Sequence, residues 1–367
     1  MVAYWGYMFM PVIGWALCSF FNKAPINSDD KSKRKYLIFC GLFIFLMIGL
    51  RHYSVGSGDG AWYYTQWRVL SNSTFHDLLR ELRILDVEDG YIASVWIITR
   101  VLKHPQFLFV SYGLLVAISV CKFIYKNSED VVISVIMFNC LGLWAFMVQG
   151  IRQGIAMCIC LFAIEYCKTR RLIPFILTII VAMLFHASAI VFVIVYFFPL
   201  FKMKMKWYVA TTAGFVLIMP LMKYIFDFIN YVINDEYVIG NVKDASGGFA
   251  TTMIYILLVV ISIVYVREID LDKNHFSERY YNFFFYLTLC GMITFLMRYN
   301  FSSITQRVSY YYMFGQLILL PMLIEKSFSK SHGAKTLINI VVVLLCIGIA
   351  MYKSTYTELL PYNFFWQ

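Results

Sequence analysis

The chain has 367 residues, of which 61% are hydrophobic and only 14% are charged. Soluble domains carry roughly a quarter of charged residues, and one soluble core of this length could not cover so much apolar side chain. The composition therefore excludes an ordinary soluble enzyme and predicts helices that are solvated by lipid. The net charge of +10 is explained by basic loops beside a membrane. We therefore expect membrane lipid as a partner and do not expect nucleic acid.

Apolar runs recur along the whole chain, and most approach the roughly 20 residues that a helix needs to cross a bilayer. No basic segment precedes the first run, so we interpret it as a retained span and not as a cleaved signal peptide. The sequence predicts an all-α, polytopic integral membrane protein with about 10–13 transmembrane or re-entrant helices, in a single membrane domain over residues 1–367. The simple spans are expected at Val2–Phe21, Tyr36–Leu50, Gln106–Ile124, Val131–Val148, Gln153–Cys167, Trp207–Phe228, Thr251–Val266, Tyr280–Leu296, Thr305–Ile324 and Thr336–Met351.

Basic residues indicate the orientation of these spans. More than half of the 31 Lys and Arg residues fall in six short loops, which favours the cytoplasmic side for those loops. Segment 51–105 and loop 229–250 are then extracytoplasmic, and both termini face outward. In this topology Val87–Leu102 is an interfacial helix, and Leu172–Leu200 enters and returns with a turn near Phe185–Ser188. In the alternative topology, 87–102 crosses the membrane and 172–200 is one long tilted helix.

Metal and disulfide chemistry have little support in the sequence. All nine cysteines lie in or beside apolar runs, as small buried hydrophobic residues do. Asp270 and Asp272 form an Asp-x-Asp, but they share a short loop with basic residues, which favours a solvated loop over a metal site. Asp86, Glu88 and Asp89 are explained by the positive end of the helix that follows them. We expect no metal and no cofactor.

Four arginines stand at the outer ends of apolar runs, where charge is costly and therefore points to function. They are Arg51, Arg152, Arg298 and Arg307, and His186 joins them if the 172–200 segment turns as expected. Several cations on one face suit a ligand with clustered negative charge, such as a phosphate, which Arg binds through two parallel hydrogen bonds. The alternative is that each Arg extends to lipid headgroups, and that His186 is a hydrogen-bonded packing residue.

Other candidate residues lie beside these cations in the sequence. Glycines around Asp59 can expose backbone N–H groups to an anion, and Asp59 itself could act as a general base. An interfacial turn with an aromatic belt explains the same segment without a substrate. Gln149, Arg152 and Ala156 are spaced to share one helical face. The candidate sugar-binding residues are Trp62, Tyr63, Tyr64, Gln153, Tyr310 and Tyr311.

An ordered set of these motifs resembles the EpsG-like family of bacterial polysaccharide polymerases, which are related in role to the Wzy-type O-antigen and capsule polymerases. The set runs through most of the chain. The family usually reads Gly-Thr-Asp followed by an aromatic residue, whereas this chain has one more residue before Asp59, which leaves the role of Asp59 open. The matching elements are Arg51 with Val55-Gly56 and Asp59, Arg152-Gln153-x-x-Ala156, Phe185-His186-x-Ser188-Ala189, Arg307 and Leu360-Pro361-Tyr362-Asn363-Phe364-Phe365.

The resemblance implies glycosyl transfer at the outer face of the bacterial cytoplasmic membrane. The substrates would be oligosaccharide repeat units on undecaprenyl pyrophosphate, with a flippase and a chain-length regulator as partners and no cofactor. The implied pyrophosphate-binding residues are Arg51, Arg152 and Arg307, with Arg298 in second rank. The implied base is His186 or Asp59.

Three other functions are compatible with the sequence. A transporter, such as a flippase for the same lipid-linked sugar, also needs intramembrane arginines and aromatic residues. A membrane glycosyltransferase or ligase with another lipid-linked donor shares the expected topology. An O-acyltransferase has only His186 in its favour.

Overall fold

The computed structural model describes residues 2–22, 25–56, 58–78, 87–200, 206–214, 216–217, 221, 224, 249–268, 275–299, 303–328, 331–355 and 357–367. These residues form helices, and the part of the chain so described has no named strand; one antiparallel bridge joins Arg51 to Phe364. The chain divides into two compact units. Unit 1 comprises Met1–Val193 and Thr336–Gln367, and unit 2 comprises Ile194–Lys335.

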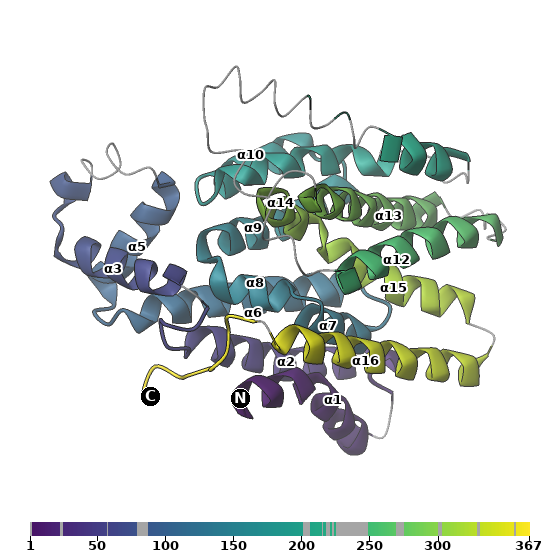
Figure 1. Ribbon diagram of the computed structural model, residues 1–367, viewed down its shortest axis with the longest axis horizontal. Coiled ribbons are helices and arrows are strands. Elements are labelled where there is room, and N and C mark those ends of the chain that lie inside the picture. The colour runs from purple at the N-terminus through teal and green to yellow at the C-terminus, as the bar shows by residue number, and fades with distance from the viewer. Residues whose placement is uncertain are drawn as a thin grey trace. The chain divides into compact units, whose positions relative to one another are not determined.

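Unit 1 is a bundle of apolar helices (Figure 1). In it, α2 packs along α6, α6 along α9, and α9 along α10, while α3 packs on α5. Two elements, η2 (Ala187–Leu200) and α16 (His332–Ser354), extend across the boundary between the units. The other helices of unit 1 are α1 (Val2–Asn22), η1 (Ile26–Ser28), α2 (Asp30–Gly49), α3 (Gly58–Asn72), α5 (Asp89–Val101), α6 (Gln106–Asn127), α7 (Val131–Cys140), α8 (Leu143–Gln149), α9 (Ile151–Lys168) and α10 (Leu172–Met183).

Side-chain caps explain where two of these helices begin. Asp29 accepts a hydrogen bond from the Ser32 backbone N–H at 2.9 Å, and Asp130 accepts one from the Val132 N–H at 3.0 Å. Each carboxylate satisfies a backbone donor that has no partner within its helix. As a result α2 begins at Asp30, before the apolar run that the sequence marks at Tyr36.

Two of the expected spans are each formed by a pair of helices, and whether each pair makes one crossing stays a prediction. Val131–Val148 forms α7 and α8, which are bent by 52° at the break between them. Gly142 lies at this break with φ of 105°, a left-handed conformation that glycine adopts readily. Thr305–Ile324 likewise forms two helices, α14 and α15. An unbroken apolar run in the sequence does not reveal such bends.

The segment 172–200 breaks where the sequence predicts a turn. Helix α10 ends at Met183, and the 3-10 helix η2 begins at Ala187, so the alternative of one continuous helix is wrong. Helix α5 has 13 residues, fewer than the roughly 17–25 that a crossing needs. This length suits the expected interfacial helix, whose position in a membrane stays a prediction.

Unit 2 is built around α13 (His275–Leu296). Helix α13 packs against α12 (Phe249–Glu268), α14 (Ser303–Tyr312) and α15 (Phe314–Ser327). A short 3-10 helix, η5 (Met297–Tyr299), follows α13 and contacts both α13 and α14. Residues 229–248 of the expected outer loop, and also Asp270 and Asp272, lie outside the described residues.

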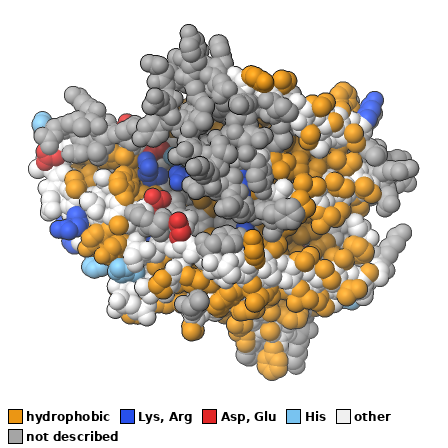
Figure 2. All heavy atoms as spheres, in the orientation of Figure 1, with side chains coloured by type: hydrophobic (Ala, Val, Ile, Leu, Met, Phe, Trp, Pro, Cys, Tyr) orange, Lys and Arg blue, Asp and Glu red, His pale blue; other side chains and the backbone are white. Residues whose placement is uncertain are grey.

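Three of the described helices are long and apolar enough to cross a membrane on their own. These are Val2–Phe20, Gln106–Asn127 and His332–Ser354, with α7 and α8 as a fourth if the bent pair counts as one span. Further apolar helices are shorter, and many large apolar side chains, such as Leu344 at 63% exposure, lie on the surface. Figure 2 shows apolar side chains over much of one face. The prediction of an all-α, polytopic membrane protein is therefore confirmed.

Candidate functional site

Glu88 holds together two predicted site residues that come from distant parts of unit 1. Its Oε2 atom accepts a hydrogen bond from Arg152 Nη1 at 2.6 Å, and its Oε1 atom lies 2.5 Å from His186 Nδ1. The backbone N–H of Ala187 also donates to Oε1, at 3.3 Å. The side chains of Glu88, His186 and Arg152 are 16%, 25% and 29% exposed. This Glu88 cluster, composed of Glu88, Arg152 and His186, is thus largely buried but open to solvent.

The ends of three helices position the Glu88 cluster. Glu88 is the N-cap residue of α5, Arg152 is in the first turn of α9, and His186 follows the end of α10. A Cβ atom on Gly90 would lie 2.6 Å from the Leu184 carbonyl oxygen, so only glycine lets α5 begin this close to the end of α10. The N-termini of α5 and α9 carry positive partial charge and favour an anion.

Aromatic residues of α3 border the cluster. The Arg152 guanidinium lies over the Trp62 ring, 5.1 Å from its centroid, and the Tyr63 hydroxyl accepts a hydrogen bond from Arg152. Trp62 also stacks on Tyr91 at a centroid distance of 6.2 Å. Tyr64 stacks on Tyr53 instead, at 4.7 Å. Trp62 therefore lies beside Arg152, and sugar binding by Trp62, Tyr63 and Tyr64 stays a prediction.

Arg51 lies near the same aromatic residues but is fully buried. Its Nη1 donates to the Val55 carbonyl at 2.5 Å, and its guanidinium lies over Phe109, 4.5 Å from the ring centroid. Its Nε and Nη2 atoms have no hydrogen-bond partner among the described residues. Asp59, exposed in the first turn of α3, and Tyr63 both interact electrostatically with Arg51. Tyr63 thus interacts with both Arg51 and Arg152.

The C-terminal tail fixes the turn that carries Arg51. The backbone N–H of His52 donates to the Asn363 carbonyl at 2.9 Å, and the N–H of Phe365 donates to the Leu50 carbonyl at 2.9 Å. The Tyr362 hydroxyl donates to the backbone carbonyl of Met47, in the last turn of α2. The motif Leu360–Phe365 therefore has a structural role, which is to hold the end of α2 and the turn after it.

The negative charge of Glu88 reduces the positive potential that Arg152 alone would create at the site. Burial by itself would raise the pKa of the Glu88 carboxyl, but the hydrogen bond from His186 and the charge of Arg152 outweigh burial and lower this pKa to about 2. Glu88 is therefore ionised at neutral pH and offsets the charge of Arg152. A bound anion at Arg152 would meet a partly neutralised cation and not an open cationic patch.

The lowered pKa predicts a pH-dependent contribution of Glu88 to stability. An acid with a folded-state pKa below its ordinary 4.5 stabilises the fold above about pH 4.5, and this stabilisation is lost as the pH falls toward 2. Glu88→Gln should lower the free energy of unfolding at pH 7 by about 2–3 kcal/mol. Thermal unfolding of both proteins in detergent between pH 7 and pH 3 measures the difference, which should shrink below pH 4.5. A constant difference over that range would contradict the assignment.

The predicted site residues of unit 2 form a separate group. Arg298 is 6% exposed, its Nη1 donates to Gln306 Oε1 at 2.9 Å, and Gln306 Nε2 donates to the Tyr310 hydroxyl at 3.1 Å. Arg307 is exposed, whereas Tyr311 is 1% exposed. The expected convergence of these residues with Arg51 and Arg152 involves both units and stays a prediction.

The sequence missed Glu88 and misplaced one neighbour of Arg152. Glu88 is adjacent to a helix start, which explains an acid without any ligand, and its partners lie far from it in the sequence. Gln149 ends α8, and Arg152 lies in α9, which begins after Gly150, so the expected shared helical face of Gln149 and Arg152 is wrong. Gln153 is 4% exposed, and its role in sugar binding stays a prediction.

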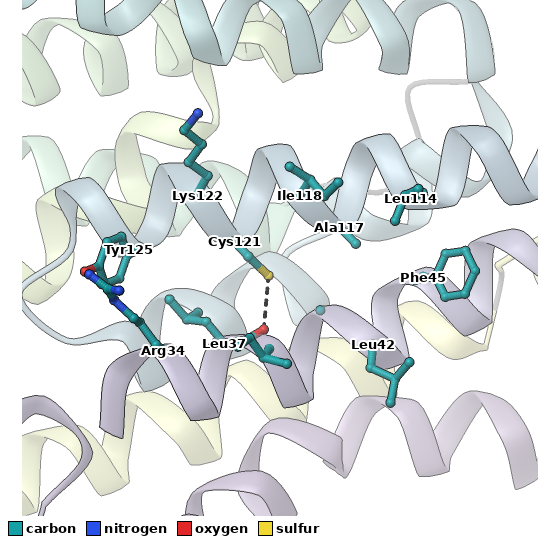
Figure 3. Close-up of a pocket in the computed structure, with 12 residues that line it drawn as sticks. Arg34, Leu37, Leu42, Phe45, Leu114, Ala117, Ile118, Cys121, Lys122 and Tyr125 are labelled. Atoms are coloured by element: carbon teal, nitrogen blue, oxygen red, sulfur yellow. Dashed lines mark hydrogen bonds between the residues drawn. The ribbon is translucent and has the colours of Figure 1, made fainter. Parts of the chain in front are cut away.

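An apolar groove of about 540 Å³ runs between α2 and α6, away from the cluster. Figure 3 shows Arg34 and Tyr125 at one end of it and Leu42 and Phe45 toward the other. The Arg34 guanidinium is already paired with the Asp30 carboxylate at 2.9 Å. The groove begins near the start of α2, whereas Arg51 follows the end of that helix. None of the candidate site residues lines this groove.

Comparisons with known proteins identify one family. The model of the EpsG family matches residues 34–364, a range that includes Glu88, Arg152, His186 and the C-terminal motif. No curated protein and no solved structure matches the chain.

Proposed function

The chain belongs to the EpsG family, and from this premise we propose that it polymerises oligosaccharide repeat units carried on undecaprenyl pyrophosphate. Family membership supports a polymerase-type role in polysaccharide biosynthesis in general, and the fold is that of a multi-pass membrane protein. The donor, the acceptor and a site at the outer face of the bacterial cytoplasmic membrane are our proposal. The Glu88 cluster carries it, because a cation and an imidazole meet there beside an aromatic wall.

The first requirement of the reaction is stabilisation of the leaving group. The bond between the anomeric carbon and the pyrophosphate breaks, and its electron pair leaves with the lipid pyrophosphate. Negative charge therefore grows on the pyrophosphate in the transition state, where fixed cationic donors are most effective. Arg152 uses one nitrogen on Glu88, and a guanidinium has five N–H donors, so others remain for a phosphate oxygen. The N-terminus of α9 adds further positive potential.

The second requirement is removal of a proton from the acceptor. A sugar hydroxyl of the acceptor unit attacks the anomeric carbon, a new C–O bond forms, and the hydroxyl proton must leave. We assign His186 as the group that takes this proton. Its Nδ1 faces Glu88, which leaves Nε2 for the acceptor. Trp62 offers an aromatic face for a sugar ring beside Arg152.

The other candidate residues have supporting places in this proposal. Asp59 is the alternative base, because it is exposed next to Tyr63. Arg51 has two nitrogens without a hydrogen-bond partner in the described part of the chain but is buried, so it binds pyrophosphate only if the turn around it opens. Arg307 is exposed and Arg298 is hydrogen-bonded to Gln306. Both are proposed as further pyrophosphate ligands from unit 2.

The direct test is polymerisation by the purified protein. We expect the protein in proteoliposomes to convert a synthetic undecaprenyl-pyrophosphate-linked repeat unit into a ladder of longer chains, without ATP, nucleotide sugar or added metal. Gel separation of the released glycans measures this. Movement of the unit across the bilayer with no elongation would instead identify a flippase. Transfer to a different acceptor would identify a ligase.

The proposed orientation can be tested independently. Cysteines introduced one at a time at Ser188 and Asp272, in a background without native cysteines, should react with a membrane-impermeant maleimide from opposite sides of the membrane. Position 188 adjoins the Glu88 cluster through Ala187, so its side of the membrane is also the side of the proposed site. Labelling of both positions from the same side would contradict the orientation derived from the basic loops.

A further inference from the structure

We propose that Glu88 is a positioning residue that aligns the proposed base His186 and the proposed phosphate ligand Arg152 at the same time. This inference rests on the proposed function and adds to it a residue that the family motifs do not include. Three contacts meet on one carboxylate: Arg152 Nη1 at 2.6 Å, His186 Nδ1 at 2.5 Å and the Ala187 N–H at 3.3 Å.

The contact with His186 fixes which ring nitrogen carries the proton. An ionised carboxylate can only accept hydrogen bonds, and Glu88 is ionised at neutral pH. Nδ1 of His186 must therefore donate to Glu88, which leaves Nε2 of the neutral ring with a free lone pair. Such a ring can take a proton only at Nε2, so Glu88 determines the direction from which the acceptor hydroxyl must approach.

The contact with Ala187 holds the Glu88 carboxylate next to the His186 ring. Ala187 follows His186 directly, and its backbone N–H binds the same oxygen that faces the imidazole. Gly90 allows the start of α5 to approach the end of α10, with its missing Cβ 2.6 Å from the Leu184 oxygen. A backbone N–H next to His186 therefore holds the Glu88 carboxylate where the start of α5 meets the end of α10.

The second carboxylate oxygen orients the guanidinium of Arg152. With Nη1 on Glu88 and the guanidinium plane over Trp62 at 5.1 Å, the remaining N–H donors of Arg152 have a fixed direction. Because a single carboxylate contacts both groups, the distance between the proposed base and the proposed leaving-group ligand is fixed as well. Glycosyl transfer requires such a fixed distance, since the acceptor and the leaving group must both be held at the anomeric carbon.

The kinetic test compares Glu88→Gln with the matched control Asp89→Asn, an exposed acid at the next position. In the proteoliposome assay Glu88→Gln should lower kcat about 100-fold, whereas Asp89→Asn should stay within about twofold of the parent protein. The decisive variant combines Glu88→Gln with His186→Ala. It should be slower than His186→Ala alone by less than about 100-fold, because the part of the Glu88→Gln loss that acts through His186 is already lost and only the part that acts through Arg152 remains. Losses that multiply, or a Glu88→Gln variant as active as the parent, would overturn the proposal.

A second measurement needs no Glu88 variant and no polymerase activity. In ¹⁵N-histidine NMR spectra of the full-length protein in detergent micelles, the His186 signals are assigned by their loss in His186→Ala. We expect a proton on Nδ1, because the ionised Glu88 carboxylate can only accept a hydrogen bond from it. An Nδ1 without a proton would refute the positioning role even if the protein polymerises glycans. The expected proton on Nδ1, together with an inactive parent protein, would instead count against the proposed function alone.

Discussion

Arg152→Ala is expected to stop chain elongation and to leave single repeat units on their lipid carrier. The protein should still insert into the membrane, because Arg152 lies in the first turn of α9 and its side chain is 29% exposed. Loss of one charge-stabilising donor in a transition state typically costs about 10²–10³ in rate. In cells, unpolymerised repeat units should accumulate outside, where glycan gels and mass spectrometry detect them.

The choice of variants separates this effect from damage to the fold. Arg152→Ala also leaves Glu88 without its 2.6 Å partner, and an unpaired, largely buried charge is itself destabilising. Arg152→Lys keeps the positive charge but loses the planar set of guanidinium N–H donors. It should therefore be more active than the alanine variant and clearly less active than the parent protein. Arg68→Ala, at an exposed position of α3, removes an arginine outside the cluster and should elongate normally. Full-length polymer from Arg152→Ala would remove Arg152 from the reaction.

Arg307→Ala extends the same test to unit 2. Arg307 is exposed on α14, so its replacement should not disturb the core. If Arg307 binds the pyrophosphate, the variant should also accumulate single repeat units. The KM for the donor should rise more than kcat falls, because a group that binds the donor and the transition state equally affects mainly KM. The proteoliposome assay measures both constants. Normal constants for Arg307→Ala would remove Arg307 from the proposed pyrophosphate ligands.

The sequence reveals those parts of this protein that depend on local patterns. Apolar runs mark most helices, and the turn between α10 and η2 follows from the length of the run and its basic ends. The bend at Gly142 was missed, since a glycine in an apolar run is equally compatible with a straight helix. The family motifs located Arg152 and His186, but the hydrogen bonds that join them through Glu88 depend on three helix ends that meet only in the folded chain.

Burial was the other quantity that sequence patterns could not supply. Arg51 stands at the end of an apolar run, where a cation reaching toward headgroups or toward a ligand would be exposed. In the structure it is fully buried under Phe109, and the turn around it is held by the C-terminal tail. The packing partner at the far end of the chain lies more than 300 residues away, at Asn363, and no periodicity within either segment points to the other.

His186→Ala is expected to have an effect as large as that of Arg152→Ala, but through the acceptor and not through the leaving group. A general base contributes typically about 10²–10⁴ in rate, and it acts on the acceptor hydroxyl and not on donor binding. The variant should therefore lower kcat strongly while the KM for the lipid-linked donor changes little. Single-turnover assays with donor in excess over a labelled acceptor measure the step directly.

The same variant separates catalysis from packing. His186 is 25% exposed at the end of α10, so alanine removes little buried area, and His76→Ala provides a control at an exposed histidine outside the cluster. If His186 is only a packing residue, His186→Ala should lower the thermal midpoint without a selective loss in kcat. If His186 is the base, His186→Ala should lower kcat and leave the thermal midpoint nearly unchanged.

If His186→Ala elongates at the parent rate, another group must take the proton. Asp59→Asn then becomes the informative variant, because Asp59 is an exposed acid beside Tyr63. Loss of activity in Asp59→Asn alone would move the base to the start of α3 and leave Glu88 as a structural partner of Arg152.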